Sequence, residues 1–78
     1  MAEKRTVKEE DLAVMAKSFR KNAGKSKADV ARELGVAPPT VFSAEEKPQM
    51  SLTKLRIRMI EAYSPFEVIG PVFMLMRK

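Results

Sequence analysis

The segment from Ser26 to Glu46 constrains the fold most, because it predicts two short helices joined by a tight turn. Ser26 is a good N-cap residue, and Asp29, three positions later, completes a capping-box pattern. Gly35 stands where a helix ends in a left-handed residue, and Pro38 suits the first position of a second helix. Helices this short are marginal alone, so the pair must pack against the rest of the chain. Helix, tight turn, helix is also the geometry that delivers a helix to the major groove of DNA.

The spacing of Ala31, Gly35 and Val41 resembles the helix-turn-helix of the phage repressor and Cro-like family. The resemblance implies that the small residue lets the helices cross closely, the glycine makes the turn, and the branched residue fills the angle between them. The runs VARELGV and TVFSAEE resemble the family pattern through both helices, whereas Lys27 stands where the family usually has glutamine. The expected fold is therefore mainly α: a four-helix, repressor-like helix-turn-helix domain.

Two further helices complete a helical core that we expect to span residues 6–63. Residues Thr6 to Glu9 form a second capping-box pattern, so the first helix should begin at Val7 or Lys8. The polar residues before it, Met1 to Arg5, should be frayed. The last helix should begin after Ser51 as N-cap. Its apolar stripe is Leu52, Leu55, Met59, Ile60 and Tyr63. Its charged side chains, expected mainly on the other sides, are Lys54, Arg56, Arg58 and Glu61.

Residues 64–78 differ in character and predict a C-terminal β-strand extension around Gly70-Pro71. This pair could be a hairpin turn, or a bulge in one bent strand. The bent strand is favoured, because Gly-Pro is not a preferred two-residue hairpin turn. A lone strand needs partners for its backbone groups, and the same strand of a second chain is the nearest candidate. Some repressors of the resembled family dimerise in this way; the alternative is that the strand packs on its own helices. The expected interface residues are Phe66, Val68, Val72, Phe73, Met74, Leu75 and Met76.

Composition limits the size and chemistry of the molecule. With 78 residues the chain has room for a single domain, 1–78. Its net charge of +5 points to an anionic partner, most often nucleic acid, although many small domains are mildly basic for solubility alone. Cysteine and histidine are both absent, which excludes disulfides, thiol chemistry and a zinc finger. Without any catalytic constellation or Gly-rich phosphate loop, we expect no enzyme, no cofactor and no metal.

Hydropathy predicts a protein of the cytoplasm without a membrane partner. No apolar run follows Met1, so no secretory signal is expected. The longest apolar run, Val68 to Met76, is too short to cross a bilayer as a helix.

The resemblance places residues 38–46 in the major groove of double-stranded DNA. The base-proximal positions carried over from the family, with their nearest hydroxyl neighbour, are Pro38, Pro39, Thr40, Phe42 and Ser43. This set is unusual, because base edges are mostly read by Arg, Lys, Asn or Gln. Pro39 and Phe42 could touch thymine methyl groups. Alternatively, Pro38, Pro39 and Phe42 form an apolar protein-binding patch, or Phe42 folds back into the core.

Phosphate contacts are expected from the N-terminus of the first motif helix and from the residue after the second. The main candidates are Lys25, Ser26, Lys27 and Lys47, and the weaker ones are Arg20, Lys21 and Arg32. A helix N-terminus itself favours anions. Glu45 would repel phosphate if it faced the DNA. In related sequences an acidic residue here makes internal contacts, so we assign Glu45 a structural role.

Three functional hypotheses follow from the sequence. The first is a small homodimeric DNA-binding transcriptional regulator, with residues 38–46 in the major groove. The alternative is a protein-interaction module, antitoxin-like or anti-repressor-like, on the same fold with an unknown protein partner. RNA binding is weaker, because the 4 phenylalanines and 1 tyrosine offer few surfaces for stacking bases.

Overall fold

The computed structural model describes residues 4–70 and 73–78. In these residues the elements in chain order are β1 (Lys4–Thr6), α1 (Glu9–Asn22), α2 (Lys27–Leu34), α3 (Pro38–Glu46), α4 (Thr53–Tyr63), β2 (Phe66–Ile69) and β3 (Met74–Arg77). The mainly helical class with a C-terminal β extension, expected from the sequence, is confirmed. None of the described helices is both long enough and apolar enough to cross a membrane.

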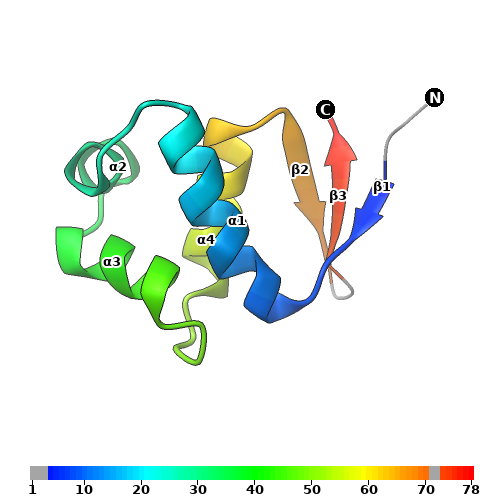
Figure 1. Cartoon of the computed structure of the whole chain (residues 1–78), viewed down its shortest axis with the longest axis horizontal. Helices are drawn as coiled ribbons and strands as arrows, with labels where there is room; N and C mark the ends of the chain where they lie inside the picture. The colour runs from blue at the N-terminus through cyan, green and yellow to red at the C-terminus, as the bar shows by residue number, and fades with distance from the viewer. Residues whose placement is uncertain (1–3, 71–72) are drawn as a thin grey trace.

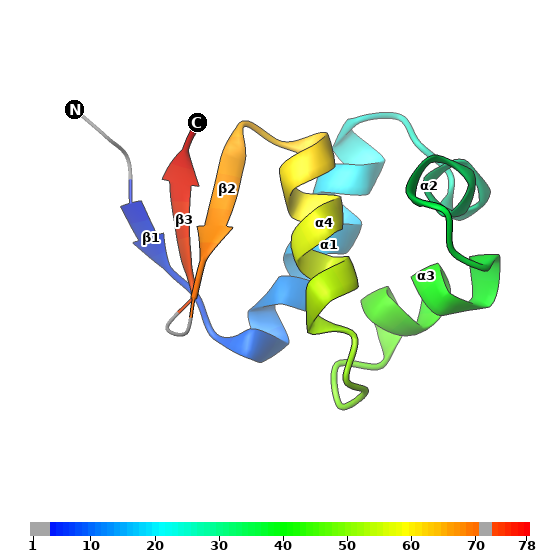
Figure 2. The same ribbon diagram turned by 180° about the vertical axis from the view of Figure 1, so that it is seen from behind.

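The helix-turn-helix and the sheet lie at opposite ends of the molecule's long axis (Figure 1). α1 and α4 pack against each other between them, as the view from behind also shows (Figure 2). Every helix contributes to one apolar core, and β3 reaches it through Leu75. The side chains of this core with essentially no exposed surface are Leu12, Ala16, Val30, Val41, Ala44, Met59, Ile60 and Leu75. Burying this common core stabilises helices that would be marginal as isolated segments.

The N-terminal segment differs from the sequence prediction. Lys4 and Arg5, which were expected to be frayed, form β1 with Thr6, antiparallel to β3; residues 1–3 of the same expectation lie outside the described residues. Because Thr6 belongs to this strand, it cannot cap α1, which begins at Glu9 with Lys8 as its N-cap. The Lys8 N–H donates to the Asp11 carboxylate at 3.1 Å, so Asp11 takes the role expected for Glu9.

The C-terminal residues form a hairpin, so the favoured bent strand was wrong. β2 and β3 pair antiparallel with Val68 opposite Leu75, and the strand order is β1-β3-β2. The connection spans residues 70–73, so the hairpin does not depend on a two-residue Gly-Pro turn; Pro71 and Val72 lie outside the described residues. Both edges of β3 are occupied within the chain. The expected pairing of β3 with the same strand of a second copy therefore has no free edge to use.

The predicted interface residues divide between the two faces of the sheet. Phe66, Val68 and Phe73 pack against the helical core that buries Leu75. By strand alternation, Met74 and Met76 lie on the opposite face with Ile69, which is the register partner of Met74. The edge of β2 is also blocked, because the Val68 N–H donates to the Glu61 carboxylate at 3.0 Å.

Gly35 ends α2 in the left-handed region, with φ +72°, and an added Cβ would meet nothing within 4 Å. We therefore expect Gly35→Ala to lower the free energy of unfolding by about 1–2 kcal/mol, from backbone conformation alone. Gly35→Asn should cost less, because asparagine tolerates this region. Urea titration of the three proteins measures the difference. Equal stability of the alanine and asparagine variants would contradict the conformational explanation.

Candidate nucleic-acid interface

The N-terminus of α2 is held by the capping box predicted from the sequence. The Asp29 N–H donates to the Ser26 Oγ at 3.0 Å, and the Ser26 N–H donates back to the Asp29 carboxylate at 3.0 Å. The expected phosphate contact from Ser26 would therefore compete with the capping bond that its hydroxyl already accepts.

The turn between α2 and α3 has the geometry expected for a helix-turn-helix. After Gly35, the Val36 N–H donates to the Ala31 carbonyl at 2.9 Å, which closes the end of α2. Ala31 and Val41 are both buried where the two helices meet. Pro38 opens α3. Of the three residues that carried the family resemblance, Gly35 ends α2 at the turn, and Ala31 and Val41 are buried on the two helices that pack together.

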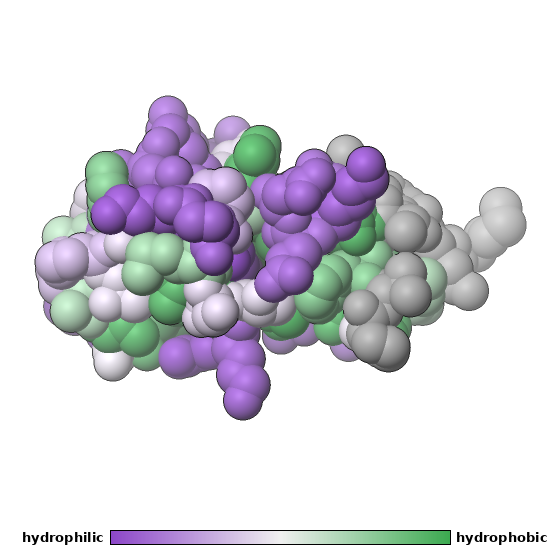
Figure 3. All heavy atoms as spheres, turned by 90° about the horizontal axis from the view of Figure 1, so that it is seen from below, coloured by the Kyte–Doolittle hydropathy of each residue, from purple (hydrophilic) through white to green (hydrophobic). Residues whose placement is uncertain are grey.

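The solvent-facing side of α3 is largely apolar. Pro38, Pro39 and Phe42 are exposed, and Phe42 keeps 47% of its surface accessible, so it does not fold back into the core. Ser43 is half-buried beside them. Thr40 is separated from this set, because it lines an open groove of about 560 Å³ toward the start of α4. Seen from below, the α2–α3 end carries pale and green surface between purple patches (Figure 3).

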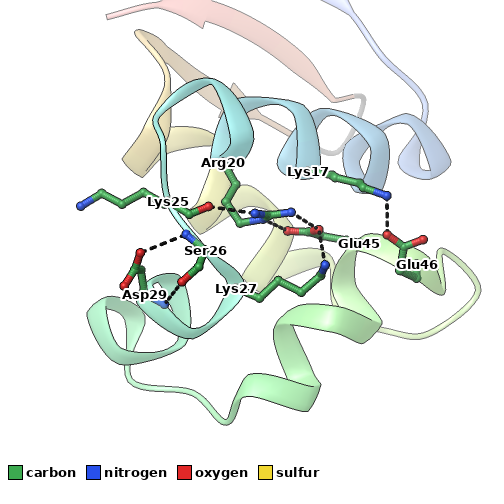
Figure 4. Close-up of polar contacts among 8 residues, drawn as sticks. All are labelled: Lys17, Arg20, Lys25, Ser26, Lys27, Asp29, Glu45 and Glu46. Carbon is green, nitrogen blue, oxygen red and sulfur yellow. Dashed lines mark hydrogen bonds and ion pairs between the residues drawn. The ribbon is translucent and has the colours of Figure 1, made fainter.

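Glu45 is buried and joins α3 to α1. Its carboxylate accepts from Arg20 Nε at 2.5 Å and from Arg20 Nη2 at 3.0 Å, while Arg20 Nη1 donates to the Lys25 carbonyl at 2.8 Å (Figure 4). The bond with Glu45 raises the pKa of Arg20 above its ordinary value. The internal role assigned to Glu45 is confirmed, whereas the weaker assignment of Arg20 to phosphate was wrong, because only 6% of its surface is exposed.

Arg56 is fully buried, although the sequence placed it among the outer charges of α4. Its Nε donates to the Ala44 carbonyl at 2.9 Å and its Nη2 to the Lys47 carbonyl at 2.8 Å, so it closes the C-terminal end of α3. Its Nη1 is buried and has no hydrogen-bond partner among the described residues. Burial lowers the pKa of this guanidinium. Partial negative charge at the helix C-terminus helps to offset the buried cation.

The predicted phosphate-binding lysines differ in how far their charges are already neutralised. Lys25 donates to Glu33 at 2.8 Å. Lys27 lies 3.9 Å from the buried Glu45 and 5.8 Å from the centre of the Phe42 ring, a cation–π distance. Among the described residues, Lys47 has no acidic group in salt-bridge range. Lys27 and Lys47 are therefore the best-placed candidates of the set.

Lys21 and Arg32 were the other weaker candidates for phosphate contact. Arg32 forms an ion pair with Asp29 at 2.8 Å. Lys21 is exposed and, within residues 4–70 and 73–78, forms no ion pair. The described residues contain no group of three acidic side chains that could hold a metal ion.

Asp29 should make stability pH-dependent. The Ser26 N–H bond, followed by Arg32, lowers the pKa of Asp29 from 3.8 to about 2. The pKa of Asp29 in the folded protein lies below its unfolded value of about 3.9. The ionised carboxylate therefore stabilises the fold above pH 4, and this contribution is lost as the pH falls toward 2. We expect Asp29→Asn to show a smaller acid-induced fall in Tm between pH 5 and pH 2. Parallel curves for the two proteins would contradict this assignment.

Comparison of the chain with models of protein families, with curated proteins and with solved structures found no significant match.

Proposed function

We propose that the protein is a small DNA-binding transcriptional regulator of the repressor and Cro-like class, working in the cytoplasm. Helix α3 enters the major groove, and the N-terminus of α2 rests on the phosphate backbone. The observation that carries the proposal is the α2–turn–α3 unit with an exposed α3 face. The Gly35 turn sets the geometry of this unit, and the pair of Arg20 and Glu45 fastens α3 to α1. A net charge of +5 supports an anionic partner.

The test is binding to duplex DNA measured against salt concentration. A dimer that makes six or more phosphate contacts should lose about 10³-fold or more in affinity between 50 and 200 mM salt. Replacing Lys27 or Lys47 with alanine should weaken binding to all sequences and reduce the salt slope by about one unit per contact. Lys8→Ala, an exposed lysine before α1, serves as the matched control. Absence of binding at low ionic strength, or binding insensitive to salt, would refute the proposal.

We propose further that the active form is a homodimer with two copies of α3 about one duplex turn, or 34 Å, apart. Because β3 has no free edge, the contact surface offered by the C-terminal residues is the outer face of the sheet. Ile69, 38% exposed, lies there opposite Met74. Aliphatic and methionine side chains on the sheet face opposite the helical core are typical of a contact surface.

Ile69→Lys should therefore convert the dimer into a monomer that keeps its helical fold, because the side chain lies outside the core. Sedimentation at several concentrations measures the change. Val14→Lys, at a position on α1 that is 68% exposed, should leave the dimer intact. A dimer that survives Ile69→Lys would place the contact elsewhere.

A protein-interaction module on the same fold is the second candidate, and the exposure of Phe42 beside Pro38 and Pro39 favours it. Phe42→Ala separates the two functions. If DNA affinity is unchanged and a copurifying protein is lost, the interaction module is the better description.

A further inference from the structure

The exposed side of α3 presents an aromatic ring and two prolines where a DNA-reading helix normally presents hydrogen-bonding side chains. Phe42 is 47% exposed, and Pro38 and Pro39 are exposed beside it. Among the described residues of α3, the half-buried Ser43 supplies the one uncharged hydrogen-bonding side chain of this face. The α3 side chains on this face thus offer no paired hydrogen bonds to polar base edges.

The remaining polar side chains of α3 are committed elsewhere. Glu46 accepts from Lys17 at 2.7 Å. The Glu45 carboxylate accepts both Arg20 bonds and is fully buried. Thr40 lines the groove toward α4. The acidic groups of α3 are therefore neutralised, and the apolar face is not bordered by an uncompensated negative charge from its own helix.

Positive charge borders the same face. The Lys27 ammonium lies 5.8 Å from the centre of the Phe42 ring. It lies 3.9 Å from the carboxylate of Glu45, which is already paired with Arg20. Lys47, directly after α3, has no acidic group in salt-bridge range within the described part of the chain. An apolar strip with the Lys27 cation beside its phenylalanine ring complements a surface that carries methyl groups between rows of phosphate. This charge complementarity favours duplex DNA over an uncharged protein surface.

We propose that Phe42 and Pro39 read the C5-methyl groups of thymines in the major groove, while Lys27 neutralises the adjoining phosphate. The inference rests on the proposed DNA-binding function and specifies how that function selects its sequence. The thymine methyl is the apolar group that a base pair presents in this groove. Polar base edges covered by Phe42 would lose water without gaining a hydrogen bond, which disfavours sites that lack the methyl.

The experiment removes the methyl group alone. The tightest duplex is selected from a randomised pool made with thymidine, and the same sequence is then remade with deoxyuridine. Phosphates and hydrogen-bonding groups are identical in the two forms. Burial of one methyl-sized group contributes about 0.8 kcal/mol, and 1.4 kcal/mol is tenfold. Affinity should therefore fall roughly fourfold for each contacted methyl, or about sixteenfold for one methyl in each half-site.

Two variants assign this difference to the protein surface. Phe42→Ala should bind the thymidine and deoxyuridine duplexes with equal affinity, and its Tm should stay close to that of the wild type because the ring is exposed. Val14→Ala, which also removes an exposed apolar side chain but from α1, should keep the full discrimination.

Each result has a separate meaning. Salt-dependent binding with equal affinity for both duplexes would overturn methyl reading and leave DNA binding in place. Discrimination that persists in Phe42→Ala would also overturn it, because the difference would then arise in the DNA or in another residue. Unchanged DNA affinity in Phe42→Ala with loss of a bound protein would assign the face to protein docking. Absence of binding to any duplex at low salt would remove the DNA-binding proposal itself.

Discussion

Replacing Glu45 with alanine is expected to lower the free energy of unfolding by about 3–5 kcal/mol. The substitution leaves the Arg20 guanidinium, only 6% exposed, without its two carboxylate bonds. A buried charge without its partner costs far more than the intact pair contributes. A domain of 78 residues has a total stability of roughly 4–12 kcal/mol, so this loss approaches the point at which the fold is no longer populated.

Urea unfolding followed by circular dichroism measures the loss, and two further proteins show its origin. In the double variant Arg20→Met with Glu45→Leu neither charge of this pair remains, so it should be much more stable than Glu45→Ala alone. Glu46→Ala is the matched control, because its pair with Lys17 lies at the surface, with side chains 35% and 37% exposed. That pair should contribute at most about 1 kcal/mol. Similar losses in Glu45→Ala and Glu46→Ala would show that burial of the ion pair does not determine its effect.

The parts of the fold that the sequence predicts correctly are those determined by neighbouring residues. The Ser26 and Asp29 capping box, the left-handed Gly35 and the start of α3 at Pro38 all involve groups within a few positions of one another. Their sterics and hydrogen bonds are local, so their residue types are sufficient to predict them.

The sheet shows why other parts could not be predicted. β1 contains only three residues, and Lys4–Thr6 has no apolar alternation to indicate a strand. Its partner β3 lies at the other end of the chain, and pairing at such a separation leaves no local signal. Once β1 is known, the reason for the hairpin is clear. β1 and β2 satisfy both edges of β3, so the strand does not require a second chain.

The candidate interface was predicted in outline, but its charges were not. The sequence predicted that Val41 lies inward, as it does in the structure, but left open whether Phe42 lies outward or in the core, and the structure exposes it. Periodicity cannot show that Lys25 pairs with Glu33 or that Lys27 lies over the Phe42 ring, since these contacts depend on how helices meet. Arginine is mostly an exposed residue, so the burial of Arg20 and Arg56 had no signal in the sequence.

Both buried arginines act on α3, which is short and carries no basic residue in its last turn. Arg20 reaches it from α1 through Glu45, and Arg56 reaches it from α4 through two carbonyls at its C-terminal end. α1 and α4 therefore hold α3 in position, whatever the intrinsic helix propensity of the α3 sequence. Its outer face is then free to carry residues chosen for contact, including prolines and a phenylalanine.

Arg56→Lys is expected to be more destabilising than Arg56→Met, although lysine conserves the charge. The guanidinium reaches the Ala44 carbonyl at 2.9 Å and the Lys47 carbonyl at 2.8 Å at once. The lysine ammonium lacks the planar set of N–H donors that lets the guanidinium reach both carbonyls. It is also more strongly hydrated than a guanidinium, so burying it costs more free energy. We expect a loss of about 3 kcal/mol for lysine. For methionine we expect about 1 kcal/mol, because the Ala44 and Lys47 carbonyls each lose the Arg56 donor but no charge remains buried at this site.

Urea unfolding ranks the variants, and hydrogen exchange reports on α3 itself. The Lys47 N–H donates at 2.9 Å to the Ser43 carbonyl, next to the Ala44 carbonyl that Arg56 binds, and the Met50 N–H donates at 3.0 Å to the Lys47 carbonyl that Arg56 also binds. Both amides should exchange faster in Arg56→Met, whereas the Val36 N–H at the end of α2 should be less affected. A lysine variant as stable as the wild type would show that a positive charge at this site is sufficient for stability. The two hydrogen bonds from Arg56 to the Ala44 and Lys47 carbonyls would then not be what holds the end of α3.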